Sequence, residues 1–222
     1  MKNLASYIDH TLLAQDATSD MIKKLCDEAN EYNFCSVCVN SSYVKEAKEF
    51  LGKSSVKICS VVGFPLGAMS SKAKAYEAKI AIEDGADEID MVINVGWVKS
   101  AQFERVRDDM AVLNSTCKDV ILKVILETAL LEDDEIREVC RISKEIGVDF
   151  VKTSTGFSTR GASLEDIKIM KDVVGTSVEI KASGGIRDYK KAISMIEAGA
   201  TRLGVSAGIA IVNGAIDKGK GY

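Results

Sequence analysis

The sequence predicts a single-domain α/β protein, a closed (β/α)₈ barrel that spans residues 1–222. Short runs rich in β-branched and apolar residues alternate with amphipathic segments of helical length, a pattern typical of βαβ units and a parallel sheet. Eight such units follow one another without a linker or a change in composition, which favours a closed barrel. A doubly wound open sheet would carry a glycine-rich phosphate loop after its first strand, and "SVCVNSSYV" at 36–44 has none.

The strands are expected in the apolar runs of the chain. Seven runs are clear, and "SYIDHT" at 6–11 is counted as the eighth because it completes the alternation. The seven lie at 36–40, 56–64, 88–94, 120–127, 149–155, 178–183 and 201–206.

The helices are expected in the segments between these strands. The predicted ranges are 18–33, 41–52, 70–85, 100–115, 131–147, 163–175 and 188–199. Several carry end signals: Ser163 precedes a helix with Asp166 near its third position, and Gly147, Gly175 and Gly199 each follow a last helical turn.

Composition narrows the class of protein. The 46% hydrophobic and 28% charged content is that of a globular enzyme, and the net charge of −4 argues against a general affinity for nucleic acid or anionic membrane. The first residues show no basic region followed by an apolar one, and no run reaches the roughly 18 apolar residues of a membrane span. We therefore expect a cytoplasmic protein with no nucleic-acid or membrane partner.

The six cysteines are interpreted as structural thiols. Cys35 and Cys38 form a CxxC, but the surrounding "FCSVCV" is strand-like, whereas a redox CxxC opens a helix. No second CxxC or His pair completes a zinc set. The sequence thus predicts neither a metal site nor a cofactor.

Charged side chains interrupt four of the predicted strands. Asp90 lies inside an apolar run, which is anomalous for a strand buried on both faces. Lys123 and Glu127 lie four apart in the next strand and so would share a face, while Lys152 and Lys181 close the two strands after it. Because alternate residues of barrel strands point inward, these groups are expected to converge near the carboxyl ends of the strands.

The first strand offers two further ionisable groups. Asp9 could join the lysine–aspartate cluster from that strand. His10, the only histidine, is interpreted as a hydrogen-bonded residue at the rim of the barrel, with a catalytic role as the alternative.

Two lysines at equivalent strand ends suggest Schiff-base chemistry. An ammonium group about 5 Å away on the next strand disfavours a second positive charge, so one lysine is expected to be a neutral amine that can attack a carbonyl. The alternative is a structural ion-pair network, which three lysines with few acids would leave unbalanced. The hydroxyls of "TST" after Lys152 favour it over Lys181 as nucleophile, although position alone does not decide between them.

Glycine-rich turns after the last two strands predict a phosphate site. "SGGIR" at 183–187 and "LGVSAG" at 203–208 stand where (β/α)₈ barrels bind phosphate through backbone N–H groups. Gly156 is expected to add an amide. Arg187 could add charge, and an ordinary exposed arginine is the alternative.

The whole set of motifs resembles the 2-deoxyribose-5-phosphate aldolase family. The resemblance runs in order along nearly the entire chain, through "YIDHTLL", "SVCVN", "VVGFPLG", "DEIDMVINVG", "LKVILET", "DFVKTSTGF", "EIKASGGIR" and "RLGVSAG". It implies a metal-independent lyase that forms a Schiff base on a (β/α)₈ barrel. Such an enzyme interconverts 2-deoxy-D-ribose 5-phosphate with D-glyceraldehyde 3-phosphate and acetaldehyde in deoxynucleoside breakdown.

The resemblance also assigns roles to residues. Lys152 would form the Schiff base, Asp90 and Lys181 would relay protons, and Lys123 would hold Asp90 or Asp9 in place. The residues expected against the substrate phosphate are Gly156, Gly184, Gly185, Gly204 and Ser206. The family further implies a homodimer without a cofactor.

Arg160, where the family often has glycine, is the departure expected to affect binding most. The tail, about 216–222, is expected to be mobile, and its Tyr222 could close over the site as a proton carrier or have no role. Two other functions stay open: a barrel lyase or transaldolase-like enzyme acting on a different phosphorylated carbonyl, and a silent sugar-phosphate binder.

Overall fold

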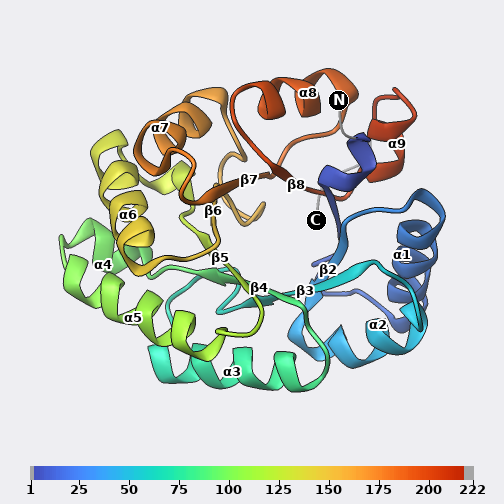
Figure 1. The fold of residues 1–222 in the computed structure, drawn as a ribbon, viewed down its shortest axis with the longest axis horizontal. Helices are drawn as coiled ribbons and strands as arrows, with labels where there is room; N and C mark the ends of the chain where they lie inside the picture. Colours follow the sequence, from blue (N-terminus) through green and yellow to red (C-terminus); the bar gives the residue numbers. More distant parts are fainter. Residues whose placement is uncertain (1–2, 218–222) are drawn as a thin grey trace.

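A closed barrel of parallel strands forms the centre of the protein. The computed structural model describes residues 3–217, and the eight strands found there pair in chain order, with the last pairing to the first. Figure 1 shows this ring of strands with the helices around it. The predicted (β/α)₈ barrel is confirmed, and the open doubly wound sheet is excluded. The strands are β1 (Ile8–Thr11), β2 (Ser36–Asn40), β3 (Lys57–Val62), β4 (Glu88–Val92), β5 (Ile121–Ile125), β6 (Phe150–Lys152), β7 (Glu179–Ser183) and β8 (Arg202–Val205).

The helices cover the outer face of the barrel. Seven of them match the seven predicted segments, with α5 ending one residue beyond its predicted range. These helices are α1 (Ser19–Tyr32), α2 (Val44–Leu51), α3 (Ser71–Glu83), α5 (Phe103–Thr116), α6 (Asp133–Ile146), α7 (Leu164–Val174) and α8 (Tyr189–Glu197). Their ends follow the predicted signals. The Ser163 side chain accepts a hydrogen bond from the Asp166 amide at the start of α7, and Gly147 ends α6 in the left-handed region at φ 79°.

Short helical pieces were missed by the periodicity. They are α4 (Val95–Lys99), α9 (Gly208–Val212) and the 3₁₀ turns η1 (Leu4–Tyr7), η2 (Ser41–Tyr43) and η3 (Thr128–Leu130). A helix of five residues is too short to repeat an amphipathic pattern. One local signal was available for α4, because the Asn94 side chain accepts a hydrogen bond from the Trp97 amide as an N-cap.

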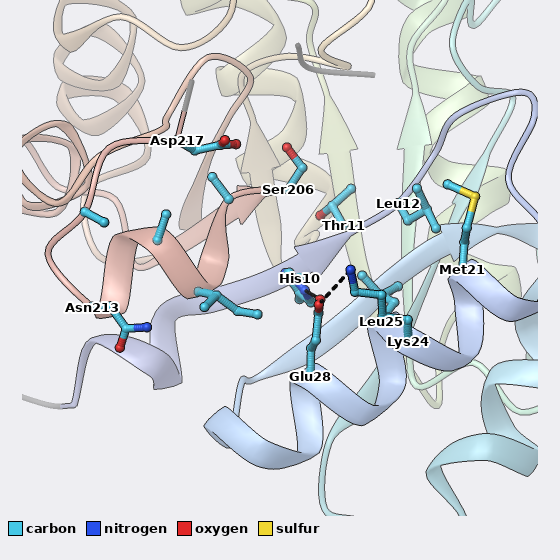
Figure 2. A pocket seen from close by; sticks show the side chains of 14 residues that line it. His10, Thr11, Leu12, Met21, Lys24, Leu25, Glu28, Ser206, Asn213 and Asp217 are labelled. Carbon is cyan, nitrogen blue, oxygen red and sulfur yellow. Dashed lines mark hydrogen bonds and ion pairs between the residues drawn. The ribbon is translucent and has the colours of Figure 1, made fainter. Parts of the chain in front are cut away.

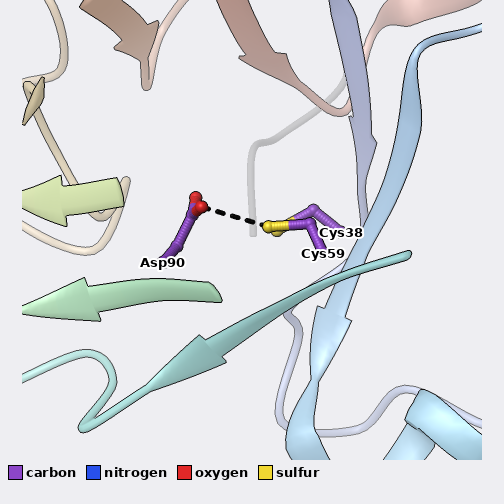
Figure 3. A group of neighbouring side chains, drawn as sticks. All are labelled: Cys38, Cys59 and Asp90. Atoms are coloured by element: carbon purple, nitrogen blue, oxygen red, sulfur yellow. Dashed lines mark hydrogen bonds between the residues drawn. The ribbon is translucent and has the colours of Figure 1, made fainter. Parts of the chain in front are cut away.

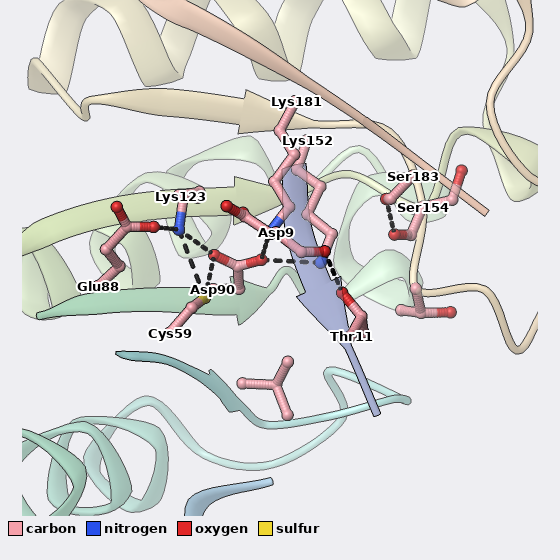
Figure 4. A network of polar contacts seen from close by, with 12 residues as sticks. Asp9, Thr11, Cys59, Glu88, Asp90, Lys123, Lys152, Ser154, Lys181 and Ser183 are labelled. Carbon is pink, nitrogen blue, oxygen red and sulfur yellow. Dashed lines mark hydrogen bonds and ion pairs between the residues drawn. The ribbon is translucent and has the colours of Figure 1, made fainter. Parts of the chain in front are cut away.

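Inward and outward side chains alternate along the strands and separate two environments. On β4, Ile89 and Met91 belong to the apolar core between barrel and helices, whereas Glu88 and Asp90 point into the barrel (Figure 4). A small apolar cluster lies inside the barrel as well, formed by Leu13, Cys38, Cys59 and Val61 with Phe64 and Phe157. The barrel interior is therefore mostly polar, and the main apolar core surrounds it.

The register of the strands places the charged residues side by side. Asp90 on β4 pairs with Lys123 on β5, and Lys152 on β6 pairs with Lys181 on β7. Lys181 in turn pairs with Arg202, the first residue of β8. The predicted convergence thus follows from direct pairing between neighbouring strands.

Only the start of the predicted tail falls within the described residues. Ile216 forms an antiparallel bridge with Asp188, and the Asp217 amide donates a hydrogen bond to the Arg187 carbonyl at 3.1 Å. Tyr222 lies outside the described residues. None of the helices between residues 3 and 217 has the length and hydropathy that a membrane span requires.

Candidate functional site

Six charged side chains inside the barrel form a closed ring in which carboxylates and cations alternate. We call it the charge ring; Figure 4 shows five of its members, and the complete set is Asp9, Lys181, Asp90, Lys123, Glu88 and Arg202. Five of the six side chains are buried, and that of Arg202 is 11% exposed.

One arm of the ring runs from Asp90 through β7 and β1 to Arg202. Asp90 Oδ2 lies 2.7 Å from Lys181 Nζ, and Lys181 Nζ lies 2.5 Å from Asp9 Oδ2. The other oxygen of Asp9, Oδ1, lies 2.7 Å from Arg202 Nη1. Asp9 thus joins the cluster as the sequence predicted.

The other arm runs from Asp90 through β5 and back across the barrel. Asp90 Oδ1 lies 2.8 Å from Lys123 Nζ, which also lies 2.5 Å from Glu88 Oε2. Arg202 Nη1 closes the ring at 3.0 Å from the same Glu88 oxygen. Of the two partners expected for Lys123, the structure selects Asp90, and it adds Glu88, which the sequence reasoning missed together with Arg202.

Lys152 branches from the ring at Asp90. Its Nζ lies 2.8 Å from Asp90 Oδ2, the oxygen that Lys181 also contacts. Its side chain is 3% exposed, whereas those of Lys123 and Lys181 are 0% exposed. Of these three lysines, Lys152 therefore has the most exposed side chain.

The ring holds Asp90, Lys123 and Lys181 in their charged forms. Burial raises the pKa of Asp90, but the charges of Lys123, Lys152 and Lys181 outweigh burial and hold that pKa well below its usual value. Burial lowers the pKa of Lys181, and the carboxylates of Asp9 and Asp90 reverse this effect and hold it well above its usual value. Burial likewise lowers the pKa of Lys123, and the Asp90 carboxylate reverses this effect and holds that pKa well above its usual value. Lys123 and Lys181 are therefore ammonium groups at neutral pH.

The cluster contains more acidic groups than the sequence analysis expected beside the three lysines. Three carboxylates, those of Asp9, Glu88 and Asp90, face the four basic groups Lys123, Lys152, Lys181 and Arg202. The six members of the charge ring cancel one another, and Lys152 is the one basic group outside this balance. A neutral amine at Lys152 leaves the cluster uncharged overall.

Two thiols adjoin the Asp90 carboxylate (Figure 3). Cys38 and Cys59 are register partners on β2 and β3, and Cys59 Sγ donates to Asp90 Oδ1 at 3.1 Å. The ligand atoms of these three residues lie within 4.8 Å of one another, yet both oxygens of Asp90 already accept hydrogen bonds from lysines. Nearby ammonium groups oppose a divalent cation, so this set fits a metal poorly. All six cysteines are free thiols; Cys38 points into the barrel, and Cys35 before it is half-buried.

Glu127 does not join the ring, contrary to its predicted place beside Lys123. The strand β5 ends at Ile125, and Glu127 adopts a left-handed backbone at φ 57°, so alternation no longer applies to it. Its carboxylate accepts hydrogen bonds from the amide and hydroxyl of Thr155. Burial raises the pKa of Glu127, and the Thr155 hydrogen bonds oppose that rise. Glu127 thereby connects the segment after β5 to the segment after Lys152.

His10 does not join the charge ring, and its side chain points toward Glu28 on α1 (Figure 2). It alternates with Asp9 on β1, and its Nε2 lies 2.8 Å from Glu28 Oε2 on α1. The pair lines a cavity of about 600 Å³ between α1 and α9. The interpretation of His10 as a hydrogen-bonded residue is confirmed.

A second cavity, of about 280 Å³, lies beside the glycines that follow β6 and β7 and beside the end of β8, which contains Gly204. It is lined by all five residues predicted to contact phosphate, Gly156, Gly184, Gly185, Gly204 and Ser206. We call it the glycine-lined cavity. Gly156, Gly184 and Gly185 have positive φ angles of 92°, 83° and 70°, a conformation that favours glycine. Gly161 was missed by the sequence reasoning: a Cβ there would lie 2.1 Å from the Gly184 carbonyl oxygen.

Two arginines, Arg160 and Arg187, also line this cavity. The guanidinium of Arg160 is held by both carboxylate oxygens of Asp166, and its Nη2 donates to the Thr128 carbonyl at 3.2 Å. Arg160 therefore presents a fixed positive charge at the edge of the glycine-lined cavity. An anion is the ligand that a cavity lined by glycine turns and two arginines would take.

Comparison with known proteins gives a consistent result. A sequence model described as DeoC/LacD family aldolase matches residues 4–214. A deoxyribose-phosphate aldolase of Brevibacillus brevis is 54% identical over 220 residues, covering 99% of this chain and 100% of the relative. One from Finegoldia magna is 58% identical over 211 residues, covering 95% and 99%. The solved tetrameric deoxyribose phosphate aldolase of Aeropyrum pernix superposes with a TM-score of 0.88 at 33% identity, covering 95% of this chain and 89% of that one.

Proposed function

The chain belongs to the DeoC/LacD aldolase family, and on that premise we propose that it is a deoxyribose-phosphate aldolase. It cleaves 2-deoxy-D-ribose 5-phosphate to D-glyceraldehyde 3-phosphate and acetaldehyde through a Schiff base on Lys152. The observation that carries the assignment of Lys152 is its position. Its Nζ lies 2.8 Å from Asp90 Oδ2, its side chain is the most exposed of the three lysines, and it stands outside the charge balance of the ring.

The reaction begins at the aldehyde of the open-chain sugar. The neutral amine of Lys152 attacks C1, and Asp90 takes the proton that the nitrogen loses. The carbinolamine hydroxyl receives a proton from the Lys181–Asp90 pair and leaves as water, which produces an iminium. This cation is the electron sink for the next step. The 2.7 Å contact between Lys181 and Asp90 supports a proton exchange between them.

Cleavage then breaks the bond between C2 and C3. A base removes the proton of the C3 hydroxyl, the electrons of the C2–C3 bond flow into the iminium, and D-glyceraldehyde 3-phosphate leaves. The remaining enamine is protonated at C2, and water hydrolyses the new iminium to acetaldehyde and free Lys152. We assign the proton transfers to Asp90 and Lys181, which stay buried next to the amine throughout.

The glycine-lined cavity supplies the other end of substrate binding. We assign the 5-phosphate to the amides around Gly184, Gly185, Gly204 and Ser206, with Gly156 four residues after Lys152. Anchoring the phosphate there would hold the aldehyde over Lys152 and lower the entropic cost of reaching the transition state.

Trapping with acetaldehyde and borohydride tests this function. Reduction is expected to leave an N-ethyl group on Lys152, found by peptide mass spectrometry and absent from Lys152→Leu, while the exposed-lysine control Lys168→Leu still labels Lys152. An adduct on Lys181 would show that the two lysines have exchanged roles. No adduct together with no cleavage of the sugar phosphate would leave a sugar-phosphate binder as the function.

The proposal includes four finer points. The enzyme works without a metal, so EDTA is expected to leave turnover unchanged. It acts in the cytoplasm, in the breakdown of deoxynucleosides, and it is a homodimer. The last point is checked by light scattering, where a mass other than twice the 23.9 kDa of the chain would contradict it.

A further inference from the structure

The charge ring extends from the carboxylate beside Lys152 to the amino ends of the strands. Arg202 and Glu88 are the first residues of β8 and β4, so they lie at the amino ends of the strands, away from the carboxyl-end glycines. In a barrel ordered β1 to β8, these two strands stand opposite each other. Arg202 nevertheless contacts Glu88 at 3.0 Å and therefore spans the interior.

Each oxygen of Asp90 is connected to Arg202 by one arm of the ring. Oδ2 is reached through Lys181 and Asp9, and Oδ1 is reached through Lys123 and Glu88. Both arms end on the same atom, Arg202 Nη1. Removing Arg202 would therefore release Asp9 and Glu88 together, and through them the two lysines that orient Asp90.

We propose that Arg202 and Glu88 are positioning residues of the reaction, and that they set both the orientation of Asp90 and the charge balance around Lys152. The inference rests on the proposed function. Neither residue lines the glycine-lined cavity, so substrate binding should depend little on them.

The charge balance makes the two residues act in opposite directions. With Lys152 neutral, three carboxylates face three cations. Loss of the Arg202 charge leaves one carboxylate in excess, and protonation of Lys152 restores the balance. Loss of the Glu88 charge leaves one cation in excess, and protonation of Lys152 increases the imbalance. On a plot of activity against pH, Arg202→Met should therefore shift the acid limb to higher pH, and Glu88→Gln should shift it to lower pH.

The variants leave the other titratable residues around Lys152 unsubstituted. Asp90 on β4, Glu127 after β5 and the Cys38 thiol interact with Lys152 itself. The other titratable groups of the cluster are Lys181 on β7, Lys123 on β5, Asp9 on β1 and the Cys59 thiol. Because the double variant Arg202→Met/Glu88→Gln removes one charge of each sign, it should return the pH limb toward that of the wild type. A purely structural role predicts no such reversal.

The experiment measures turnover and Lys152 labelling in parallel. Wild type, both single variants, the double variant and Arg202→Lys are followed from pH 5 to pH 10, a range chosen to span lysine titration. Arg202→Met is expected to lower kcat by about 10²-fold with KM nearly unchanged, because Asp90 loses its alignment. Arg202→Lys, which keeps the charge, should keep the wild-type pH limb even where kcat falls, and it serves as the test if Arg202→Met does not fold.

Labelling by acetaldehyde and cyanoborohydride needs no turnover and separates two failures. If the pH dependence of Lys152 labelling shifts in opposite directions in the two single variants, but the protein does not cleave the sugar phosphate, the positioning role of Arg202 and Glu88 is supported and the proposed function is rejected. Normal cleavage by wild type with equal or absent shifts in the two single variants would overturn the ring inference alone. An increase in KM without loss of kcat would also overturn it.

Discussion

Lys152 and Lys181 are register partners on β6 and β7, and their Nζ atoms lie 2.8 and 2.7 Å from one oxygen, Oδ2 of Asp90. The two amines differ in what else they contact. Lys181 also has Asp9 at 2.5 Å, so two carboxylates stabilise its charge, whereas Asp90 is the carboxylate paired with Lys152 in the described structure. Lys181 is thus more than a source of positive field, because it belongs to a ring of alternating charges that contacts Lys152 through Asp90.

Removing the Lys181 ammonium should slow proton transfer more than it weakens binding. Lys181→Met is expected to lower kcat by roughly 10²–10⁴-fold, the range for loss of a positioned acid or base, while borohydride still traps acetaldehyde on Lys152, more slowly. Steady-state cleavage of deoxyribose 5-phosphate measures the effect, with Lys168→Met as the control. A variant with unchanged kcat would remove Lys181 from the proton relay.

A side chain added at Gly161, where the backbone packs closely against Gly184, should weaken phosphate binding. In Gly161→Ala the new methyl group would lie 2.1 Å from the Gly184 carbonyl oxygen, so the segment after β7 must move. We expect KM for the phosphorylated sugar to rise by about tenfold or more, the effect of losing roughly 1.4 kcal/mol of binding, while cleavage of unphosphorylated deoxyribose changes less. The helical glycine variant Gly96→Ala is the control. Equal losses with both sugars would argue against a phosphate site in this cavity.

Acid should unfold the protein through the ring carboxylates. Burial raises the pKa of Asp9, but Lys181 and Arg202 outweigh it and hold the pKa below its usual value, and Asp90 behaves likewise. A carboxyl with a depressed folded pKa contributes stability that is complete above its unfolded pKa, about 4, and is lost as pH falls towards the folded value. Urea midpoints between pH 2 and pH 7 should therefore fall steeply below about pH 4. The exposed control Asp108→Asn should keep this slope, and Asp90→Asn should flatten it.

A buried ion pair outside the barrel should matter for stability alone. Lys74 Nζ on α3 lies 2.7 Å from Asp109 Oδ2 on α5 and donates to the Val92 carbonyl at 2.8 Å. Lys74→Met leaves a buried carboxylate without its partner, which should cost about 3–5 kcal/mol of unfolding free energy. The double variant Lys74→Met/Asp109→Leu should recover most of that loss. Urea denaturation measures both, and a single variant as stable as wild type would refute the assignment.

Much of the site could be predicted from single residues that break a local pattern. Asp90, Lys123, Lys152 and Lys181 are charges in apolar strands, and the carboxyl ends of parallel strands must meet at one end of a barrel. The glycine turns could be predicted because they too follow the carboxyl ends of strands. Glu127 was misplaced because the sequence did not show where β5 ends, and alternation of side chains applies only within a strand.

By itself the sequence determined the alternation of strands and helices, the barrel, and the inward charges in the middle of strands. Only the tertiary structure decided how those charges are balanced. Glu88 and Arg202 stand at the beginnings of strands, where a charged residue is ordinarily solvated, and they are 114 positions apart in the chain. Closure of the barrel places β4 and β8 across one narrow interior, and their contact completes a ring that neither strand encodes alone.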